Sequence, residues 1–262
     1  MKFCLSSRVN PNLLAKADEI KFDFRDRKAI PDFYEKYPQA DIILYCPYDT
    51  ILDWDNLKEL NILSRGKLIL AVSHIADMIR AKELGFRTFY GFPVQSLYEL
   101  RSLALWEPEY VKIGIPLFFE MDNVKSFNVP VRAVPNVAYN DGMTRSDGVC
   151  GQWIRPEDLE SMYGEYIAAV EFEGVDADKE AVLYKVYAVD KKWDHGLDLI
   201  IINLNYVCQN RMILSEQIQK RLNCGHRCMM GKCNICYRVF NMADPVKIET
   251  YMEEVYPDGL PN

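Results

Sequence analysis

Short apolar runs alternate with amphipathic stretches along the first 190 residues of the chain. Eight runs rich in aliphatic, β-branched and aromatic residues occupy 2–8, 19–25, 41–47, 67–73, 86–91, 110–116, 129–139 and 166–174. Between them, the stretches 54–66, 74–85 and 94–106 carry apolar residues at helical spacing. Strands separated by helical segments of about a dozen residues are typical of parallel β/α units.

Eight β/α units are the number that closes a parallel barrel. The sequence therefore predicts an α/β protein with a (β/α)8 TIM-like barrel over residues 1–193. The units are short, so a shortened or imperfectly closed barrel also agrees with the pattern. An open doubly wound sheet is the alternative. Residues 194–262 depart from the repeat and are predicted to form a cysteine-rich C-terminal extension.

Charged residues recur at alternate positions within several of the predicted strands. Because successive side chains of a strand point to opposite faces, these charges are predicted to face the barrel interior. They are Lys21, Asp23, Arg25, Lys112, Arg132, Glu171 and Glu173. Unpaired burial of charge is costly, so the pattern predicts a polar, partly wet barrel mouth.

Residues near the carboxyl ends of barrel strands are the default catalytic candidates. We predict catalytic roles for Asp23, Arg25, His74 and Glu171, and substrate-binding roles for Lys112, Arg132, Asn136 and Glu173. The structural alternatives are an ion pair of Asp23 with Arg25, and a His74 that only begins a helix after an N-cap at Ser73. No G-x-S-x-G, Walker A, H-E-x-x-H or G-x-G-x-x-G motif is present in the sequence.

Four cysteines lie within thirteen residues near the end of the chain, at Cys224, Cys228, Cys233 and Cys236. Thiolates select zinc, copper(I) or iron–sulfur clusters. Four of them complete a structural zinc site or hold a [4Fe–4S] cluster, and the spacing leaves both open. Four free cysteines in a loop are the remaining alternative.

The formal net charge of −7 argues against a general polyanion-coating protein, although residues 210–238 are locally basic. The start of the chain lacks the pattern of a secretion signal, and no apolar run approaches the ~20 residues that span a bilayer. These features predict a cytoplasmic protein with no membrane partner.

The order of the units, "WIRPEDLE" at 153–160 and "EFEG" at 171–174 resemble the collagenase-like peptidase family. That resemblance implies a barrel with a four-cysteine iron–sulfur site. It also implies either oxygen-independent hydroxylation of RNA bases or ubiquinone precursors, or peptidase activity. The family's usual cysteine signature near the late barrel strands is not visible, and Cys150 alone falls in the corresponding loop.

Three functions follow from these observations. The first is an iron–sulfur barrel enzyme that modifies RNA or a small aromatic molecule. The second is a zinc-stabilised, non-enzymatic protein whose basic C-terminal segment contacts nucleic acid or a protein partner. The third is a peptidase, for which the sequence offers no convincing nucleophile–base pair.

Overall fold

The computed structural model of the chain describes residues 1–94, 96–114, 117, 121–135, 159, 164–190, 197–201, 206–209 and 244–247. The chain divides into two compact units, and each is described by itself. Unit 1 comprises Met1–Val134 and Met162–Phe172, and unit 2 comprises Pro135–Ser161 and Glu173–Asn262. The predicted domain boundary at residue 193 stays a prediction.

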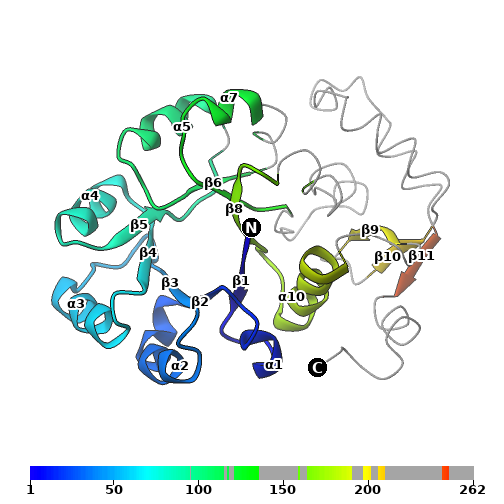
Figure 1. Ribbon diagram of the computed structural model, residues 1–262, viewed down its shortest axis with the longest axis horizontal. Helices are drawn as coiled ribbons and strands as arrows, with labels where there is room; N and C mark the ends of the chain where they lie inside the picture. The colour runs from blue at the N-terminus through cyan, green and yellow to red at the C-terminus, as the bar shows by residue number, and fades with distance from the viewer. Residues whose placement is uncertain are drawn as a thin grey trace. The chain divides into compact units, whose positions relative to one another are not determined.

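Unit 1 alternates strands with helices in the predicted order (Figure 1). Its strands are β1 (Lys2–Ser6), β2 (Glu19–Asp23), β3 (Asp41–Tyr45), β4 (Leu68–Val72), β5 (Arg87–Tyr90), β6 (Val111–Ile113), β7 (Val131–Ala133) and β8 (Ile167–Glu171). Its helices are α1 (Pro11–Leu14), the 3-10 helix η1 (Phe24–Ala29), α2 (Ile30–Lys36), α3 (Trp54–Leu63), α4 (Ile75–Glu83), α5 (Leu97–Ala104) and α7 (Met121–Lys125). All eight predicted strands are therefore confirmed.

The eight strands form one parallel sheet in the order β5-β4-β3-β2-β1-β8-β7-β6. Strands β5 and β6 stand at the two ends of this order, yet two contacts join their chain segments. Val94 forms a parallel bridge with Ile113, and the Glu109 amide donates to the Thr88 carbonyl over 2.8 Å. The sheet is thus a nearly closed TIM-like barrel, as predicted, and not an open doubly wound sheet.

The short units account for the imperfect closure. Helix α1 has four residues, and β6 and β7 have three residues each. Strands this short provide few ladder hydrogen bonds, so the last gap of the barrel is joined by single contacts. A shortened and imperfect barrel agrees with the size of the units in the sequence.

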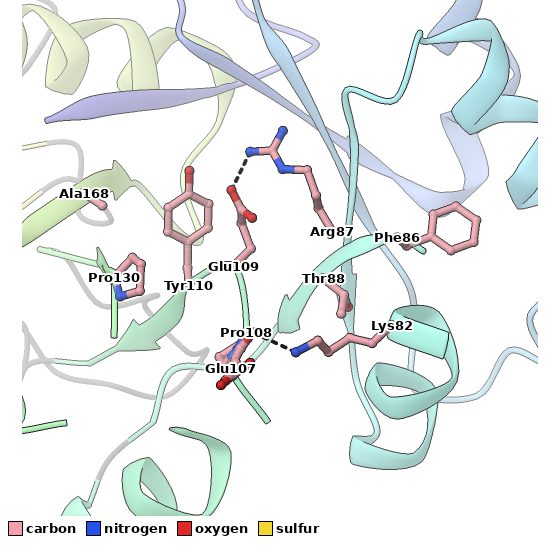
Figure 2. A pocket seen from close by; sticks show the side chains of 10 residues that line it. All are labelled: Lys82, Phe86, Arg87, Thr88, Glu107, Pro108, Glu109, Tyr110, Pro130 and Ala168. Carbon is pink, nitrogen blue, oxygen red and sulfur yellow. Dashed lines mark hydrogen bonds and ion pairs between the residues drawn. The ribbon is translucent and has the colours of Figure 1, made fainter. Parts of the chain in front are cut away.

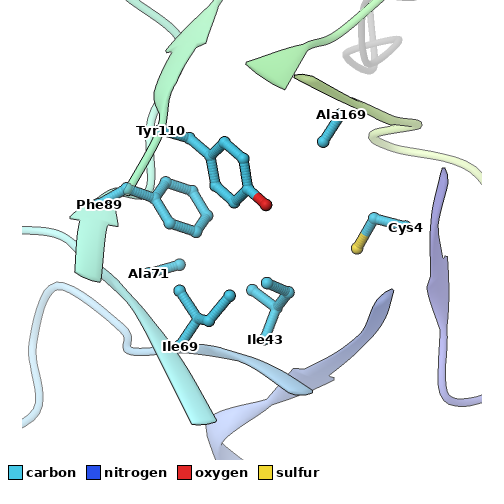
Figure 3. Packing of buried hydrophobic residues seen from close by; sticks show 7 residues of the cluster. All are labelled: Cys4, Ile43, Ile69, Ala71, Phe89, Tyr110 and Ala169. Atoms are coloured by element: carbon cyan, nitrogen blue, oxygen red, sulfur yellow. The ribbon is translucent and has the colours of Figure 1, made fainter. Parts of the chain in front are cut away.

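Apolar side chains from several strands fill part of the barrel interior (Figure 3). The cluster consists of Cys4, Ile43, Ile69, Ala71, Phe89, Tyr110 and Ala169. Figure 3 shows these side chains pointing into the space that the strands surround. The alternate strand positions, such as Ile42 and Leu44, are also fully buried, as expected where a ring of helices covers a parallel barrel.

Unit 2 contains α10 (Ala177–Tyr184), the π-helix η2 (Lys185–Asp190) and a three-stranded antiparallel sheet. The sheet has the order β11-β10-β9, with β9 at Leu197–Ile201, β10 at Tyr206–Gln209 and β11 at Asp244–Lys247.

Candidate active site

A network of buried charges crosses the barrel interior. Arg132 contributes a fully buried guanidinium that forms ion pairs with both Glu19 and Glu171. The distance from Arg132 Nη1 to Glu171 Oε2 is 3.3 Å. Lys112 is also fully buried, and its Nζ lies 3.1 Å from Glu171 Oε1. Two carboxylates and two cations therefore neutralise one another inside the barrel.

Two tyrosines extend this network. The Tyr45 hydroxyl donates to Glu171 over 2.7 Å and accepts a hydrogen bond of 3.0 Å from Lys112. The Tyr110 hydroxyl donates to Glu19 over 2.6 Å. Continuous hydrogen bonds thus connect Tyr110, which precedes β6, with Tyr45 and Glu171, the last residues of β3 and β8.

Strand register explains why residues so distant in sequence meet. Cys4 in β1 stands beside Glu19 of β2 on one side and beside Glu171 of β8 on the other. Lys112 of β6 stands beside Arg132 of β7. Because neighbouring positions of a parallel ladder point to the same face, both carboxylates and both cations face the interior.

The charged state of the network follows from its pairing. Burial by itself would raise the pKa of Glu171. The charge of Lys112, followed by those of Lys21 and Arg132, outweighs burial and lowers that pKa from 4.5 to about 2. Burial, and then the charge of Glu171, raises the pKa of Tyr45 well above its ordinary value. At neutral pH the site therefore presents a carboxylate and a neutral hydroxyl.

Lys21 adds a further cation, whose ammonium lies at the carboxyl end of β8. Its ammonium donates to the carbonyl of Phe172, the residue after β8, and its charge acts on Glu171. Lys21 thus belongs to the same network as Lys112, Arg132 and the carboxylates of Glu19 and Glu171, and Lys2 adds another cation 3.7 Å from Glu19.

Four aromatic rings, which we call the aromatic rim, lie at or just beyond the carboxyl ends of β3, β4 and β5, and they are Tyr48, His74, Tyr90 and Phe92. The rings of Tyr48 and His74 have centroids 4.3 Å apart, and the His74 Nε2 lies 3.0 Å from the Tyr48 carbonyl oxygen. The rings of Tyr90 and Phe92 have centroids 5.6 Å apart. Exposure is 67% for Tyr48 and 47% for Phe92, so both rings are available to a ligand.

Backbone contacts hold the three segments of the aromatic rim beside one another. The Cys46 amide donates to the Ala71 carbonyl, and the Gly91 amide donates to the Val72 carbonyl, each over 2.8 Å. A Cβ at Gly91 would lie 3.4 Å from the Val72 carbonyl oxygen, so this position has little space for a larger residue. The rim is thus built on adjacent strands of the barrel.

The structure brings together three of the predicted site residues, which are Lys112, Arg132 and Glu171. Two others, Asp23 and Arg25, lie elsewhere at the carboxyl end of the barrel. Strand β2 ends at Asp23, whose exposed carboxylate pairs with Arg8 over 2.7 Å, and Arg25 is exposed in η1. The predicted alternation ends where the strand ends, so Asp23 and Arg25 do not form the ion pair that the sequence suggested.

His74 is the N-cap residue of α4, and the Ser73 hydroxyl donates to the Cys46 carbonyl over 2.7 Å. The predicted N-cap at Ser73 is therefore wrong, because a carbonyl of the neighbouring loop binds that hydroxyl. Glu173 is half-buried two residues beyond β8, in unit 2. Asn136 and the four clustered cysteines, Cys224, Cys228, Cys233 and Cys236, lie outside the described residues.

Sequence reasoning missed three members of the network, Glu19, Tyr45 and Tyr110. Glu19 stands two positions before Lys21, so the same alternation could have found it. Tyr45 stands two positions after Ile43, which also faces the interior. In the sequence, Tyr45 looks like any other aromatic residue of a buried strand. Only the hydrogen bond from its hydroxyl to Glu171 reveals its polar role.

Comparisons with known proteins add little to this site. No family model and no curated protein matches the chain. Among solved structures, two have weak similarity to the chain. One is a cube-shaped, highly porous protein cage designed by fusing symmetric oligomeric domains, with 14% identity and a TM-score of 0.45 over 99% of this chain and 86% of that chain. The other is phosphoribosyl anthranilate isomerase from Thermotoga maritima, with 10% identity and a TM-score of 0.41 over 71% of this chain and 98% of that chain.

At this level of similarity neither structure assigns an activity to this chain, and the fold assignment rests on the strand order. Within the described residues, no helix is long and apolar enough to cross a membrane. Among those same residues, no group of three or more His, Cys, Asp or Glu side chains is arranged to hold a metal ion.

Proposed function

We propose that this chain is a barrel enzyme that binds a planar aromatic ring at the carboxyl end of its strands. The ring belongs to a small aromatic molecule or to a base in RNA. We further propose that the four-cysteine segment binds an iron–sulfur cluster. The aromatic rim, which stands at the same end of the barrel as Tyr45 and Glu171, is the observation that carries the proposal.

Exposed aromatic side chains stack on planar rings, and base–aromatic stacking contributes about 1–3 kcal/mol per base. Large aromatic residues are usually buried, so two exposed rings beside two further rings on adjacent strands indicate a binding surface. Tyr48 and Phe92 are the exposed members, and His74 and Tyr90 support them from beside.

The buried network supports an enzyme more than a passive barrel. Barrel interiors are normally filled by branched aliphatic residues, and active sites lie at the carboxyl ends of the strands. A buried ion network rarely adds stability over apolar residues of similar volume, so its presence needs another explanation. Tyr45 and Lys112 both donate to the Glu171 carboxylate, which is thereby held as a fixed charge at the carboxyl end of β8.

The cluster proposal rests on the donor set and on the family resemblance. Cys224, Cys228, Cys233 and Cys236 offer four thiolates, which suit an iron–sulfur cluster. When bound, such a cluster supplies one-electron redox chemistry. The peptidase alternative has less support. Cys46 is buried, and burial raises the pKa of its thiol to about 12, so it is no nucleophile at neutral pH.

The first test is ligand binding to the aromatic rim. Uridine, an unstructured oligouridine RNA and 4-hydroxybenzoate serve as probes, and the variants are Tyr48→Ala and Phe92→Ala. Each variant should weaken binding of the ring-bearing probe about tenfold, as expected from the loss of one stacked ring. The control is Tyr166→Ala, an exposed tyrosine that immediately precedes β8 at the opposite end of the barrel.

Tight binding of the oligouridine alone would select RNA, and binding of 4-hydroxybenzoate would select the small molecule. Equal binding by wild type and both rim variants, or no binding of any probe, would overturn the proposed substrate class.

The second test is metal content after purification without oxygen. Iron, sulfide and a broad visible absorption band should be present in the wild type and absent from a variant with Cys233→Ser and Cys236→Ser. One colourless equivalent of zinc, lost in that variant, would instead support the zinc-stabilised binding protein. Absence of metal from both proteins would overturn the cluster proposal.

A further inference from the structure

A pocket lies at the amino-terminal end of the barrel, opposite the aromatic rim. Its volume is about 530 Å³, within the usual range for small-molecule sites. Figure 2 shows the ten lining side chains, which come from the end of α4, the start of β5, the segments before β6 and β7, and strand β8. They are Lys82, Phe86, Arg87, Thr88, Glu107, Pro108, Glu109, Tyr110, Pro130 and Ala168. We call this hollow the amino-end pocket.

Local backbone geometry places two of its walls. After α4 the Gly85 amide donates to the Lys82 carbonyl, and the Phe86 amide donates to the Ala81 carbonyl. These two bonds form a Schellman motif, which needs the positive φ of +81° at Gly85. The motif turns the chain directly into β5, so Phe86 lines the pocket beside Lys82.

The opposite wall contains an extra residue of β8. Val131 of β7 stands beside Ile167, but the next residue, Arg132, stands beside Ala169. Ala168 is therefore a β-bulge residue without a partner in that ladder. Its small side chain lines the pocket together with Pro130. This wall is apolar and has no large side chain to fill the space.

The pocket carries both signs of charge in equal number. Arg87 forms ion pairs with Asp41, at 3.1 Å, and with Glu109. Figure 2 shows the Arg87 side chain pointing to Glu109. The Lys82 ammonium donates to the Trp106 and Glu107 carbonyls over 2.5 and 3.0 Å. Both backbone acceptors are neutral, so the positive charge of Lys82 has no carboxylate partner within the described part of the chain.

Two carboxylate groups in the pocket retain capacity to accept hydrogen bonds. The exposed carboxylate of Glu107 has no hydrogen-bond partner among the described residues, and Glu109 bonds there to Arg87 alone. A carboxylate has about four acceptor positions, so each can bind a further donor. The pocket thus offers an ammonium site at Glu107 and a carboxylate site at the neighbouring Lys82, while Glu109 is directed to Arg87.

We propose that the amino-end pocket binds a small zwitterion with an apolar side chain, of the class of the free amino acids. Its ammonium group contacts the Glu107 carboxylate, and its carboxylate contacts Lys82, which lies beside Glu107. The side chain packs against the apolar wall of Pro108, Pro130 and Ala168. A net-neutral ligand with separated charges matches a net-neutral pocket with separated charges. This proposal is independent of the function proposed for the other end of the barrel.

The test uses three probes of similar shape, titrated into the full-length chain by calorimetry at pH 7. They are L-phenylalanine, which has both charges, phenethylamine, which has the ammonium alone, and 3-phenylpropionate, which has the carboxylate alone. We expect L-phenylalanine to bind at least tenfold more tightly than either analogue. Lys82→Gln and Glu107→Gln should each weaken its binding about tenfold, as expected for loss of a charged hydrogen-bond partner.

Arg80→Gln is the matched control, because Arg80 is exposed on the same helix as Lys82 and pairs with Glu83 instead of lining the pocket. Glu107 and Lys82 are both exposed, so these variants should fold, which circular dichroism can verify. Three results would overturn the proposal. They are no binding of L-phenylalanine, equal binding of phenethylamine, and equal binding by the wild type, Lys82→Gln and Glu107→Gln.

Discussion

Removal of the buried guanidinium at Arg132 tests the physical basis of the barrel interior. Arg132 has 0% exposure and pairs with both Glu19 and Glu171. Its guanidinium also lies 4.5 Å from the ring centroid of Tyr110. The substitution Arg132→Met keeps much of the side-chain volume and removes the charge. It leaves Glu19 buried without its closest cation.

The expected loss of unfolding free energy follows from the distance between the charged groups of the ion pair. At the 3.3 Å between Arg132 Nη1 and Glu171 Oε2, Coulomb attraction is about 5 kcal/mol with an effective dielectric constant of about 20. Part of this energy offsets the cost of removing the groups from water. Removal of one partner of a buried pair typically lowers the free energy of unfolding by about 3–5 kcal/mol, and we expect Arg132→Met to fall in this range.

Urea unfolding at pH 7, followed by circular dichroism, measures this change as a shift of the midpoint. The matched control is Arg80→Met, which removes an exposed guanidinium 3.0 Å from Glu83 and should cost less than about 0.5 kcal/mol. A second variant adds Glu19→Gln to Arg132→Met. Since it also removes the stranded carboxylate, it should be more stable than Arg132→Met alone.

Two results would refute this reasoning. A loss below about 1 kcal/mol for Arg132→Met would mean that the guanidinium is not desolvated as the structure places it. A double variant that loses the full sum of the two single changes would mean that Glu19 and Arg132 do not interact.

Three further predictions concern Glu171, Tyr45 and Cys46. Because the pKa of Glu171 falls from 4.5 to about 2 on folding, its stabilisation is fully present above about pH 4.5 and is lost as pH falls towards 2. This loss should reach about 3 kcal/mol in urea titrations, and Glu171→Gln should abolish it. Tyr45→Phe removes a hydroxyl that both Lys112 and Glu171 use, and should lower the free energy of unfolding by about 1–2 kcal/mol in the same assay. The thiol pKa of Cys46 is raised to about 12, so Cys46 should resist iodoacetamide at pH 8 in the folded protein and react in urea. Peptide mass spectrometry would measure this labelling, and rapid labelling of the folded protein would contradict the burial of Cys46.

The barrel could be predicted from sequence because its signals are local. Each strand is a short apolar run, and each long connection has helical spacing, so eight units could be identified without tertiary information. Alternation within a strand then placed Lys112, Arg132 and Glu171 in the interior. The same rule failed for Arg25, because β2 ends at Asp23 and η1 begins at the next residue. Strand ends are set by tertiary contacts that the local pattern does not contain.

The details of the candidate sites depend on register and on long-range contacts. Tyr45 and Glu171 are 126 residues apart, and Tyr110 and Glu19 are 91 residues apart. No sequence spacing predicts such pairs. The amino-end pocket was invisible for the same reason, because it depends on a bulge at Ala168 and on the gap between β5 and β6.

The polar interior separates two ends of the barrel with different properties. At the carboxyl end, exposed rings stand at the strand termini from which Tyr45 and Glu171 reach inward, and the Tyr45 hydroxyl bonds to Glu171 there. At the amino end, Arg87 is balanced by Asp41 and Glu109. A barrel stabilised by packing alone would place aliphatic residues between these ends, at no loss of stability. Because the interior instead holds fixed charges in contact with residues near both ends, the network agrees with the chemistry that we propose for the mouth better than with a role in stability alone.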